Sequence, residues 1–261
     1  MKSFRNILIT GASSGIGEAL ALHLAAPAIT LFLTGRDQDR LALVVEKCKA
    51  QGATCYHTVV NVKDQTSFAN WISQMDSLAP IDLVIANAGV SSGTGGAQGL
   101  SWLAAEYDVF ETNVMGVLHT IFPLIEKMAA RKRGQIALMS SLAAFNGWPG
   151  APAYSASKAA VRYYGEALRG ALGTYGVGVS VICPGFVESR MTAVNNYRMP
   201  FFMKAPQAAA IILQGLAQNR ARIAFPLPTY IFSGLIGFLP AAAASALLSK
   251  MPPKPMKNIS E

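Results

Sequence analysis

Short apolar segments alternate with helical patterns along most of the chain, and no other feature constrains the fold as strongly. Six runs rich in apolar and β-branched residues stand at 6–10, 29–34, 54–62, 81–89, 134–141 and 178–185. Helical patterns separate them at about 17–25, 39–50, 66–78, 100–130 and 154–174. Apolar strands joined through helices are typical of a parallel sheet that is covered on both faces. The sequence therefore predicts an α/β fold with a doubly wound parallel sheet.

A single domain is the simplest organisation of this chain. No internal repeat and no long linker precede Pro226, so we expect one domain at 1–226 and an apolar C-terminal extension with a basic tail at 227–261. Apolar residues make up 52% of the chain and charged residues 14%, which excludes a disordered protein. The N-terminal segment passes directly into the first strand and does not resemble a signal peptide, so we expect a cytoplasmic protein.

The net charge of +8 raises the question of an anionic partner. The basic residues are scattered, however, and the one dense run, Arg131–Arg133, ends a predicted helix, where cations favour the helix dipole. We interpret this run as a solvated helix end and predict no nucleic-acid partner. The three cysteines and three histidines show neither the spacing of a metal site nor that of a catalytic triad, so no metal is expected.

The turn between the first predicted strand and the first predicted helix reads TGASSGIG, at Thr10–Gly17. Free backbone N–H groups at the start of a helix bind phosphate, and a dinucleotide's pyrophosphate rests at this place in a strand–turn–helix unit. Gly11 permits a tight turn, Gly15 lets the backbone approach phosphate, and Gly17 allows close packing of helix and strand. The cluster predicts a dinucleotide site in a Rossmann fold.

Further motifs follow in a fixed order along the chain. They are ANAG at Ala86–Gly89, Asn113 in the long helix, Ser141 after the fifth strand, Tyr154 and Lys158 opening the next helix, and PGFVES at Pro184–Ser189. With the T-G-x-x-x-G-x-G spacing of the glycine cluster, the chain resembles the short-chain dehydrogenase/reductase family, of the NADP-preferring type, over about residues 5–226. Ala86 stands where this family often has an asparagine, but the following Asn87 is kept.

The catalytic residues implied by the resemblance are Asn113, Ser141, Tyr154 and Lys158. Tyr154 and Lys158 are four residues apart and therefore share one helix face. An adjacent cation stabilises a phenolate, so we expect Lys158 to lower the pKa of Tyr154 from its ordinary value of about 10. The resemblance implies that Ser141 holds the substrate oxygen, that Lys158 binds the nicotinamide ribose, and that Asn113 positions a water. Packing is the alternative role for Asn113.

The preferred cofactor depends on the end of the second predicted strand. A carboxylate there would favour NAD, but the sequence has Gly35 followed by Arg36, whose guanidinium can pair with a 2′-phosphate. We therefore expect NADP, with NAD left open because Asp37 could neutralise Arg36. The cofactor contacts implied by the resemblance are Gly11, Ser13, Ser14, Gly15, Ile16, Gly17, Arg36, Asn61, Val62, Asn87, Ala88, Gly89, Tyr154, Lys158, Pro184, Gly185, Val187 and Thr192.

Two C-terminal segments bear on the substrate. In this family the segment at about 190–206 usually forms a lid, and here it carries Tyr197, Met199 and the run Phe201–Met203, which favour a hydrophobic substrate. Their alternative role is to anchor the lid to the core. Beyond it, the chain has no charge between Arg222 and Lys250, yet its prolines leave too few consecutive residues to span a membrane. A cap over the substrate pocket, a subunit interface and a peripheral membrane contact stay open for this stretch.

The sequence thus predicts an NADP(H)-dependent oxidoreductase that interconverts a carbonyl and a secondary alcohol on a hydrophobic small molecule, with tyrosine as general acid and base. A binding protein that senses NADP without catalysis is the alternative. By the same resemblance we expect a homo-oligomer, either a dimer or a tetramer.

Overall fold

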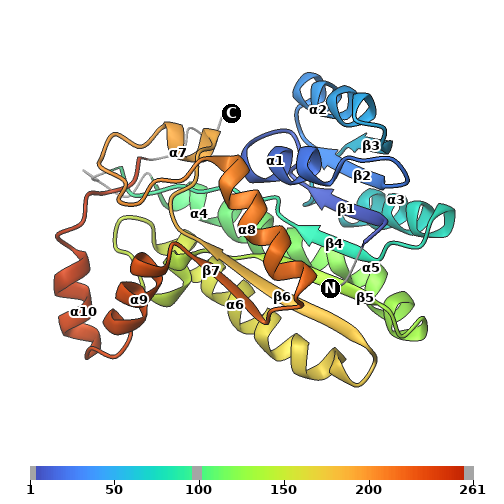
Figure 1. The fold of residues 1–261 in the computed structure, drawn as a ribbon. Coiled ribbons are helices and arrows are strands. Elements are labelled where there is room, and N and C mark those ends of the chain that lie inside the picture. The colour runs from blue at the N-terminus through green and yellow to red at the C-terminus, as the bar shows by residue number, and fades with distance from the viewer. Residues whose placement is uncertain (1–3, 96–101, 256–261) are drawn as a thin grey trace.

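The structure, a computed structural model, describes residues 4–95 and 102–255. Its centre is a parallel sheet of seven strands in the order β3-β2-β1-β4-β5-β6-β7 (Figure 1). The strands are β1 (Asn6–Thr10), β2 (Thr30–Gly35), β3 (Thr54–Val59), β4 (Leu83–Ala86), β5 (Gly134–Met139), β6 (Val177–Pro184) and β7 (Arg222–Phe225). The predicted doubly wound Rossmann fold is confirmed.

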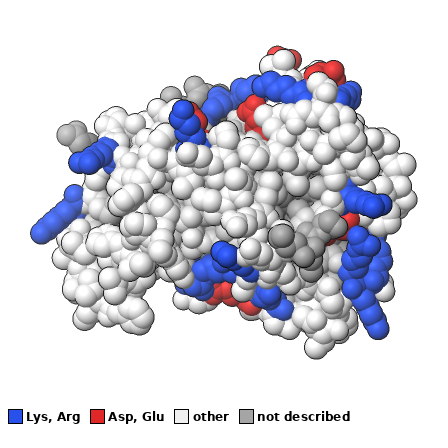
Figure 2. All heavy atoms as spheres, viewed as in Figure 1, with Lys and Arg blue, Asp and Glu red and all other residues white. Residues whose placement is uncertain are grey.

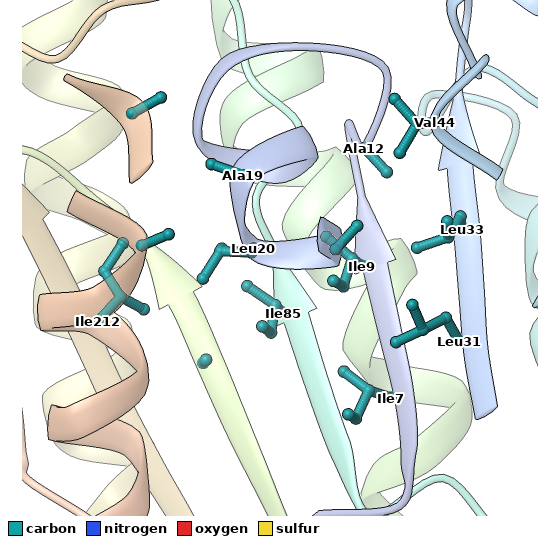
Figure 3. Packing of buried hydrophobic residues seen from close by; sticks show 14 of the residues in the cluster. Ile7, Ile9, Ala12, Ala19, Leu20, Leu31, Leu33, Val44, Ile85 and Ile212 are labelled. Atoms are coloured by element: carbon teal, nitrogen blue, oxygen red, sulfur yellow. The ribbon is translucent and has the colours of Figure 1, made fainter. Parts of the chain in front are cut away.

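Helices cover both faces of the sheet because side chains on each strand point alternately to opposite faces. Ile7 and Ile9 of β1 pack with α1 (Gly15–Leu24), α2 (Gln38–Ala50) and α8 (Ala205–Ala217), as Figure 3 shows in part. Leu8, between them, packs on the opposite face with α3 (Gln65–Leu78), α5 (Gly116–Ala130) and α6 (Pro152–Gly173). The sheet therefore lies between two apolar cores, which hold its strands and the loops at their carboxyl ends in place.

The predicted long helix at 100–130 is divided, and its first two residues lie outside the described ranges. Helix α4 (Leu103–Phe110) passes into a π-helical turn, η1 (Glu111–Met115), before α5 begins. A π-turn adds a residue to the helical repeat and often occurs at functional sites. Asn113 lies at the centre of this turn, so the altered helical repeat sets the direction of its side chain.

The strand β7 and helix α8 are not among the elements expected from the sequence. β7 has four residues and pairs with β6 through Val181–Pro184. Four residues are too few for a period-2 pattern to stand out against the apolar sequence around them. The predicted third strand also ends at Val59 rather than at Val62, because β3 is the edge strand and only β2 holds it.

The basic run at the end of α5 is exposed, as predicted, but Arg131 also forms a buried interaction. Its Nη1 and Nη2 donate to the carboxylate of Asp76 at 2.8 Å and 3.0 Å, and Asp76 also accepts from the Ile81 backbone N–H at 2.9 Å. Asp76 is only 5% exposed. Arg131 therefore links the end of α5 to Asp76 of α3.

The C-terminal extension forms α9 (Leu227–Ile236) and α10 (Ala241–Leu248), drawn in red at one end of the molecule in Figure 1. Helix α9 packs against β7 and the short 3₁₀ helix η2 (Leu142–Phe145), and Asn146 Nδ2 donates to Ser233 O at 2.7 Å. Within the described ranges no helix has the length and apolarity required to cross a membrane.

Candidate active site

A cavity of about 1130 Å³ opens along the carboxyl ends of β1, β4, β5 and β6. The strand order reverses between β1 and β4, and ligands of doubly wound sheets bind at this crevice. Every predicted site residue except Gly17, Asn61 and Asn113 lines this cavity. The sheet thus brings together motifs that are separated by up to 181 positions, from Gly11 to Thr192.

The glycine cluster has the shape of a phosphate cradle. Gly11 and Gly15 have positive φ angles of +65° and +57°, and a Cβ on Gly11 would lie 2.9 Å from the Cα of Ala88. A Cβ on Gly17 would lie 2.2 Å from Gly11 O, so this glycine packs behind the cradle instead of lining it. Ser14 precedes α1 in an extended conformation and makes no side-chain cap. The first amides of α1 are therefore available to an anion, and the residues present fit a pyrophosphate.

Asn87 connects the glycine cluster to the end of β4 through hydrogen bonds. Its Nδ2 donates to Thr10 O at 2.9 Å, and Thr10 Oγ1 accepts from the backbone N–H groups of Asn87 and Ala88 at 3.0 Å. This network fixes the glycine turn against the neighbouring strand. The asparagine that follows Ala86 is thus sufficient to support the loop.

Two arginines lie after β2, where the ribose that distinguishes NADP from NAD would bind. Arg36 is exposed and lines the cavity after β2. Asp37 caps α2 by accepting from the Arg40 N–H at 2.9 Å, and it pairs with Arg40 Nη1 at 2.7 Å. The expectation that Asp37 could neutralise Arg36 is therefore wrong, because the Asp37 carboxylate forms its ion pair with Arg40. Arg40 itself lines the cavity and was missed, although the Asp37–Arg40 spacing of a helix cap was visible in the sequence.

Asn61 does not face the cavity. Its Oδ1 accepts from the Lys63 backbone N–H at 3.1 Å, which closes a turn after β3, and its side chain is exposed. Val62 does line the cavity, and its carbonyl interacts with His119 Nδ1 at 2.9 Å. Of these two predicted cofactor contacts, Val62 therefore lies at the site, and Asn61 shapes the turn beside it.

Ser141, Tyr154 and Lys158 meet on the cavity wall. Lys158 is buried, its Nζ donates to Met139 O at 2.9 Å, and the same Nζ lies 5.8 Å from the centroid of the Tyr154 ring. Ser141 Oγ accepts from the Ala143 N–H at 3.1 Å, at the start of η2. Helix α6 and the turn after β5 therefore present a phenol, an ammonium and a hydroxyl to one space.

The predicted lowering of the Tyr154 pKa is not what this arrangement produces. Burial raises the pKa of Tyr154, and a hydrogen bond with Ser141 acts in the opposite direction. Burial also lowers the pKa of Lys158 to about 8. The correction has a physical reason: the Lys158 ammonium is directed to the Met139 carbonyl and is desolvated, so the loss of water around the phenol is the larger effect.

Asn113 lies behind the wall of the cavity, fully buried. Its Oδ1 accepts from the Val90 N–H at 2.8 Å, and its Nδ2 donates to Val90 O at 2.9 Å and to Ser157 Oγ at 3.0 Å. Both amide hydrogens are thus used in holding the loop after β4 to α6. A Cβ on Gly89 would lie 3.0 Å from Asn113 Oδ1 and 3.3 Å from Lys158 Nζ, so both groups border the same glycine.

The segment predicted to be the lid lines the cavity, but with different residues from those expected. Tyr197, Met199 and Phe201–Met203 are not part of the cavity wall; Tyr197 packs edge-on against Trp148 and Phe186, and Phe201 and Phe202 are exposed. The alternative role of anchoring therefore describes Tyr197. The wall residues of this segment are Arg190, Met191, Thr192, Ala193, Val194, Asn195 and Pro200.

The C-terminal extension closes the same cavity. Its contributions are Thr229, Phe232, Ser233, Ile236, Leu248, Met251, Lys254 and Pro255. The structure places this segment at the pocket, which is one of the three roles left open by the sequence. Sequence reasoning did not identify its individual residues, because no motif marks them.

Comparison with known proteins identifies the family. The model of the short chain dehydrogenase family matches residues 5–199. The chain is 40% identical over 225 residues to an uncharacterized oxidoreductase of Myxococcus xanthus, covering 86% of this chain and 88% of that one. It is 31% identical over 197 residues to the 3-oxoacyl-(acyl-carrier-protein) reductase FabG of Staphylococcus aureus, with 74% and 78% covered.

Solved structures agree on the fold. A short-chain dehydrogenase from Sphingobium yanoikuyae in complex with NADPH superposes with a TM-score of 0.77 at 21% identity, covering 95% of this chain and 96% of that one. A short chain dehydrogenase from Mycobacterium paratuberculosis bound to NAD gives 0.73 at 22% identity, covering 87% and 98%. The chain therefore belongs to the short-chain dehydrogenase/reductase family and is an NAD(P)-dependent oxidoreductase.

Proposed function

We propose that this protein is an NADP(H)-dependent oxidoreductase that interconverts a carbonyl and a secondary alcohol on a hydrophobic small molecule. The observation that carries the proposal is the meeting of Ser141, Tyr154 and Lys158 in the cavity that also holds the glycine cradle. A nicotinamide bound in this cavity supplies or accepts the hydride. The protein's own groups then need only hold the carbonyl oxygen and exchange its proton.

In the direction of reduction, Tyr154 is the proton donor to the carbonyl oxygen. Burial raises its pKa, so the phenol carries its proton near neutral pH. Ser141 donates a hydrogen bond to the same oxygen and polarises the carbonyl. Lys158 holds the nicotinamide ribose, and Asn113 orders the loop and helix around it through Val90 and Ser157. In oxidation the alcohol returns its proton to the Tyr154 oxygen.

The substrate side of the cavity supports a hydrophobic molecule. Leu142, Trp148 and Phe186 line it from the loops after β5 and β6, and Ile236 and Leu248 line it from the C-terminal extension. We propose residues 190–206 as the lid over this side. We also propose that the chain consists of a dinucleotide-binding domain at 1–226 and an extension at 227–261. Ile236 and Leu248 of the extension line the substrate side of the cavity.

The preference for NADP is supported by the groups at the end of β2. Arg36 and Arg40 both line the cavity there, and Arg40 Nε is buried without a hydrogen-bond partner in the part of the chain that is described. A Cβ on Gly35 would lie 3.1 Å from Ser13 Oγ, so a carboxylate at that position would displace this serine. A 2′-phosphate would be paired by guanidinium groups and a hydroxyl.

We expect Arg36→Ala to raise the KM for NADPH by roughly 10- to 100-fold, because one charge-assisted pair with the 2′-phosphate is lost. The KM for NADH should change little. The measurement is initial rates with both cofactors on one ketone. Arg220→Ala, which removes an exposed arginine after α8 that does not line the cavity, is the matched control. An equal rise for both cofactors would remove Arg36 from phosphate recognition.

The alternative, a binding protein that senses NADP, is distinguished by turnover. A panel of apolar ketones and aldehydes is followed through NADPH absorbance, with NADH in parallel. Consumption of NADPH with any member supports the oxidoreductase. NADPH binding without consumption across the panel supports the sensor.

Exposed apolar side chains favour a further partner for the protein. Tyr107 of α4, Phe122 of α5 and Tyr163 of α6 are exposed, and we propose that these helices contact a second copy in a dimer or tetramer.

The surface over α9 and α10 is mostly uncharged in Figure 2, and Phe238 there is 88% exposed. Light scattering measures the oligomer, and sedimentation with liposomes measures whether this second surface contacts a membrane.

A further inference from the structure

A second buried lysine, Lys254, lies beside the catalytic tyrosine and has no role in the reaction proposed above. It comes from the segment after α10, only 6% of it is exposed, and it lines the cavity. Its Nζ is 5.8 Å from the centroid of the Tyr154 ring, the same distance as Lys158 Nζ. Two ammonium groups from distant parts of the chain therefore lie near one phenol ring.

The segment that carries Lys254 is held in place by its backbone. The Gly95 N–H donates to Lys254 O at 2.9 Å, and the Gly93 N–H donates to Pro255 O at 3.1 Å. A Cβ on Gly93 would lie 2.3 Å from Lys254 O, so the close approach requires glycine at this position. This pairing makes the position of Lys254 a built feature of the site.

Within the described ranges, no carboxylate balances the charge of Lys254. Among residues 4–95 and 102–255 no carboxylate forms an ion pair with its Nζ, and the one hydrogen bond of this Nζ there, to Asn195 Oδ1, is long at 3.5 Å. Burial lowers its pKa to about 8, so it is still largely protonated near neutral pH. A buried ammonium without an anion is costly, and a bound anion would remove that cost.

A further donor close by has no partner. Trp148 Nε1 is buried and unbonded within the described ranges, and it lines the cavity. A Cβ on Gly150 would lie 3.0 Å from this Nε1 and 3.2 Å from the Lys254 backbone N, so the indole borders the Lys254 segment. From the end of the extension, the apolar Leu248 and Met251 line the same cavity. The surroundings combine an apolar wall with hydrogen-bond donors that lack an acceptor.

We propose that Lys254 binds a carboxylate on the substrate, so that the substrate is an apolar oxo acid, or the corresponding hydroxy acid in the oxidative direction. The inference rests on the proposed function, in which the carbonyl lies at Tyr154. Lys254 is then a determinant of substrate specificity, and the Trp148 N–H is a second donor to the same group. The apolar part of the substrate contacts Leu142, Leu248 and Met251.

Equilibrium binding tests this assignment independently of turnover. Calorimetry in the presence of NADPH compares phenylbutyrate with its neutral amide, for the wild-type protein, Lys254→Met and Lys250→Met. Lys250 is the matched control because it lies in the same segment but is exposed. We expect the wild type and Lys250→Met to bind the carboxylate roughly 10- to 100-fold more tightly than the amide, and Lys254→Met to lose this preference.

A wild type without preference, a preference that survives in Lys254→Met, or an equal loss of affinity for both ligands would overturn the assignment. Lys254→Gln, which keeps a polar group, replaces the methionine variant if thermal melting shows that the latter is unfolded. Reduction of benzoylpropionate and of its methyl ester by NADPH is measured in parallel. Failure of both to react would count against the proposed function, whereas the binding preference would still decide the role of Lys254.

Discussion

Tyr154→Phe is expected to lower kcat for ketone reduction by about 100- to 10,000-fold, the usual contribution of a general acid. The phenyl ring keeps the packing of the site but cannot donate a proton to the carbonyl oxygen. Cofactor binding should be almost unchanged, because the ring is retained and Lys158 keeps its bond to Met139 O. The measurement is steady-state turnover together with NADPH affinity from fluorescence titration.

Tyr163→Phe is the control for this experiment. Tyr163 lies on the same helix, α6, but is 65% exposed and does not line the cavity. Its hydroxyl should be dispensable for turnover. Wild-type activity in Tyr154→Phe would refute the proton-transfer role, and an equal decrease in both variants would point to disturbance of the helix.

Asp76→Ala is expected to reduce the free energy of unfolding by about 3 kcal/mol, near the lower end for loss of one partner from a buried ion pair. The carboxylate accepts from both Nη atoms of Arg131 and from the Ile81 N–H, so the substitution removes an acceptor from three donor atoms, of which Nη2 keeps a bond to Ile81 O at 3.2 Å. The lower end applies because the Arg131 side chain is 30% exposed and partly solvated. Urea denaturation followed by circular dichroism measures the change.

Glu46→Ala provides the comparison for an exposed pair. Glu46 pairs with Lys49 at 3.1 Å on the surface of α2, and such pairs contribute at most about 1 kcal/mol. Similar small changes in both variants would show that the link between α3 and α5 is not a source of stability. Cofactor affinity should be unaffected in either variant, since neither carboxylate lines the cavity.

The catalytic pair was predictable because its geometry is local. Tyr154 and Lys158 share one helix face whatever the rest of the chain does, and the glycine spacing of Thr10–Gly17 specifies a turn whose backbone is set by its own residues. The sheet followed from the periodicity of apolar residues. The direction of the Tyr154 pKa shift was not predictable, because it depends on how much water the assembled site excludes.

The sequence by itself determined the phosphate cradle and the Tyr154–Lys158 pair, since each depends on residues within a few positions of one another. It also determined the parallel sheet, because apolar segments separated by helical patterns mark its strands. Only the tertiary structure decided that a π-turn carries Asn113 and that Lys254 lies beside Tyr154. The last of these depends on contacts between Lys254 and Gly95, which are 159 positions apart in the chain. No local pattern specifies such a contact, because it forms only after the sheet and the extension have packed together.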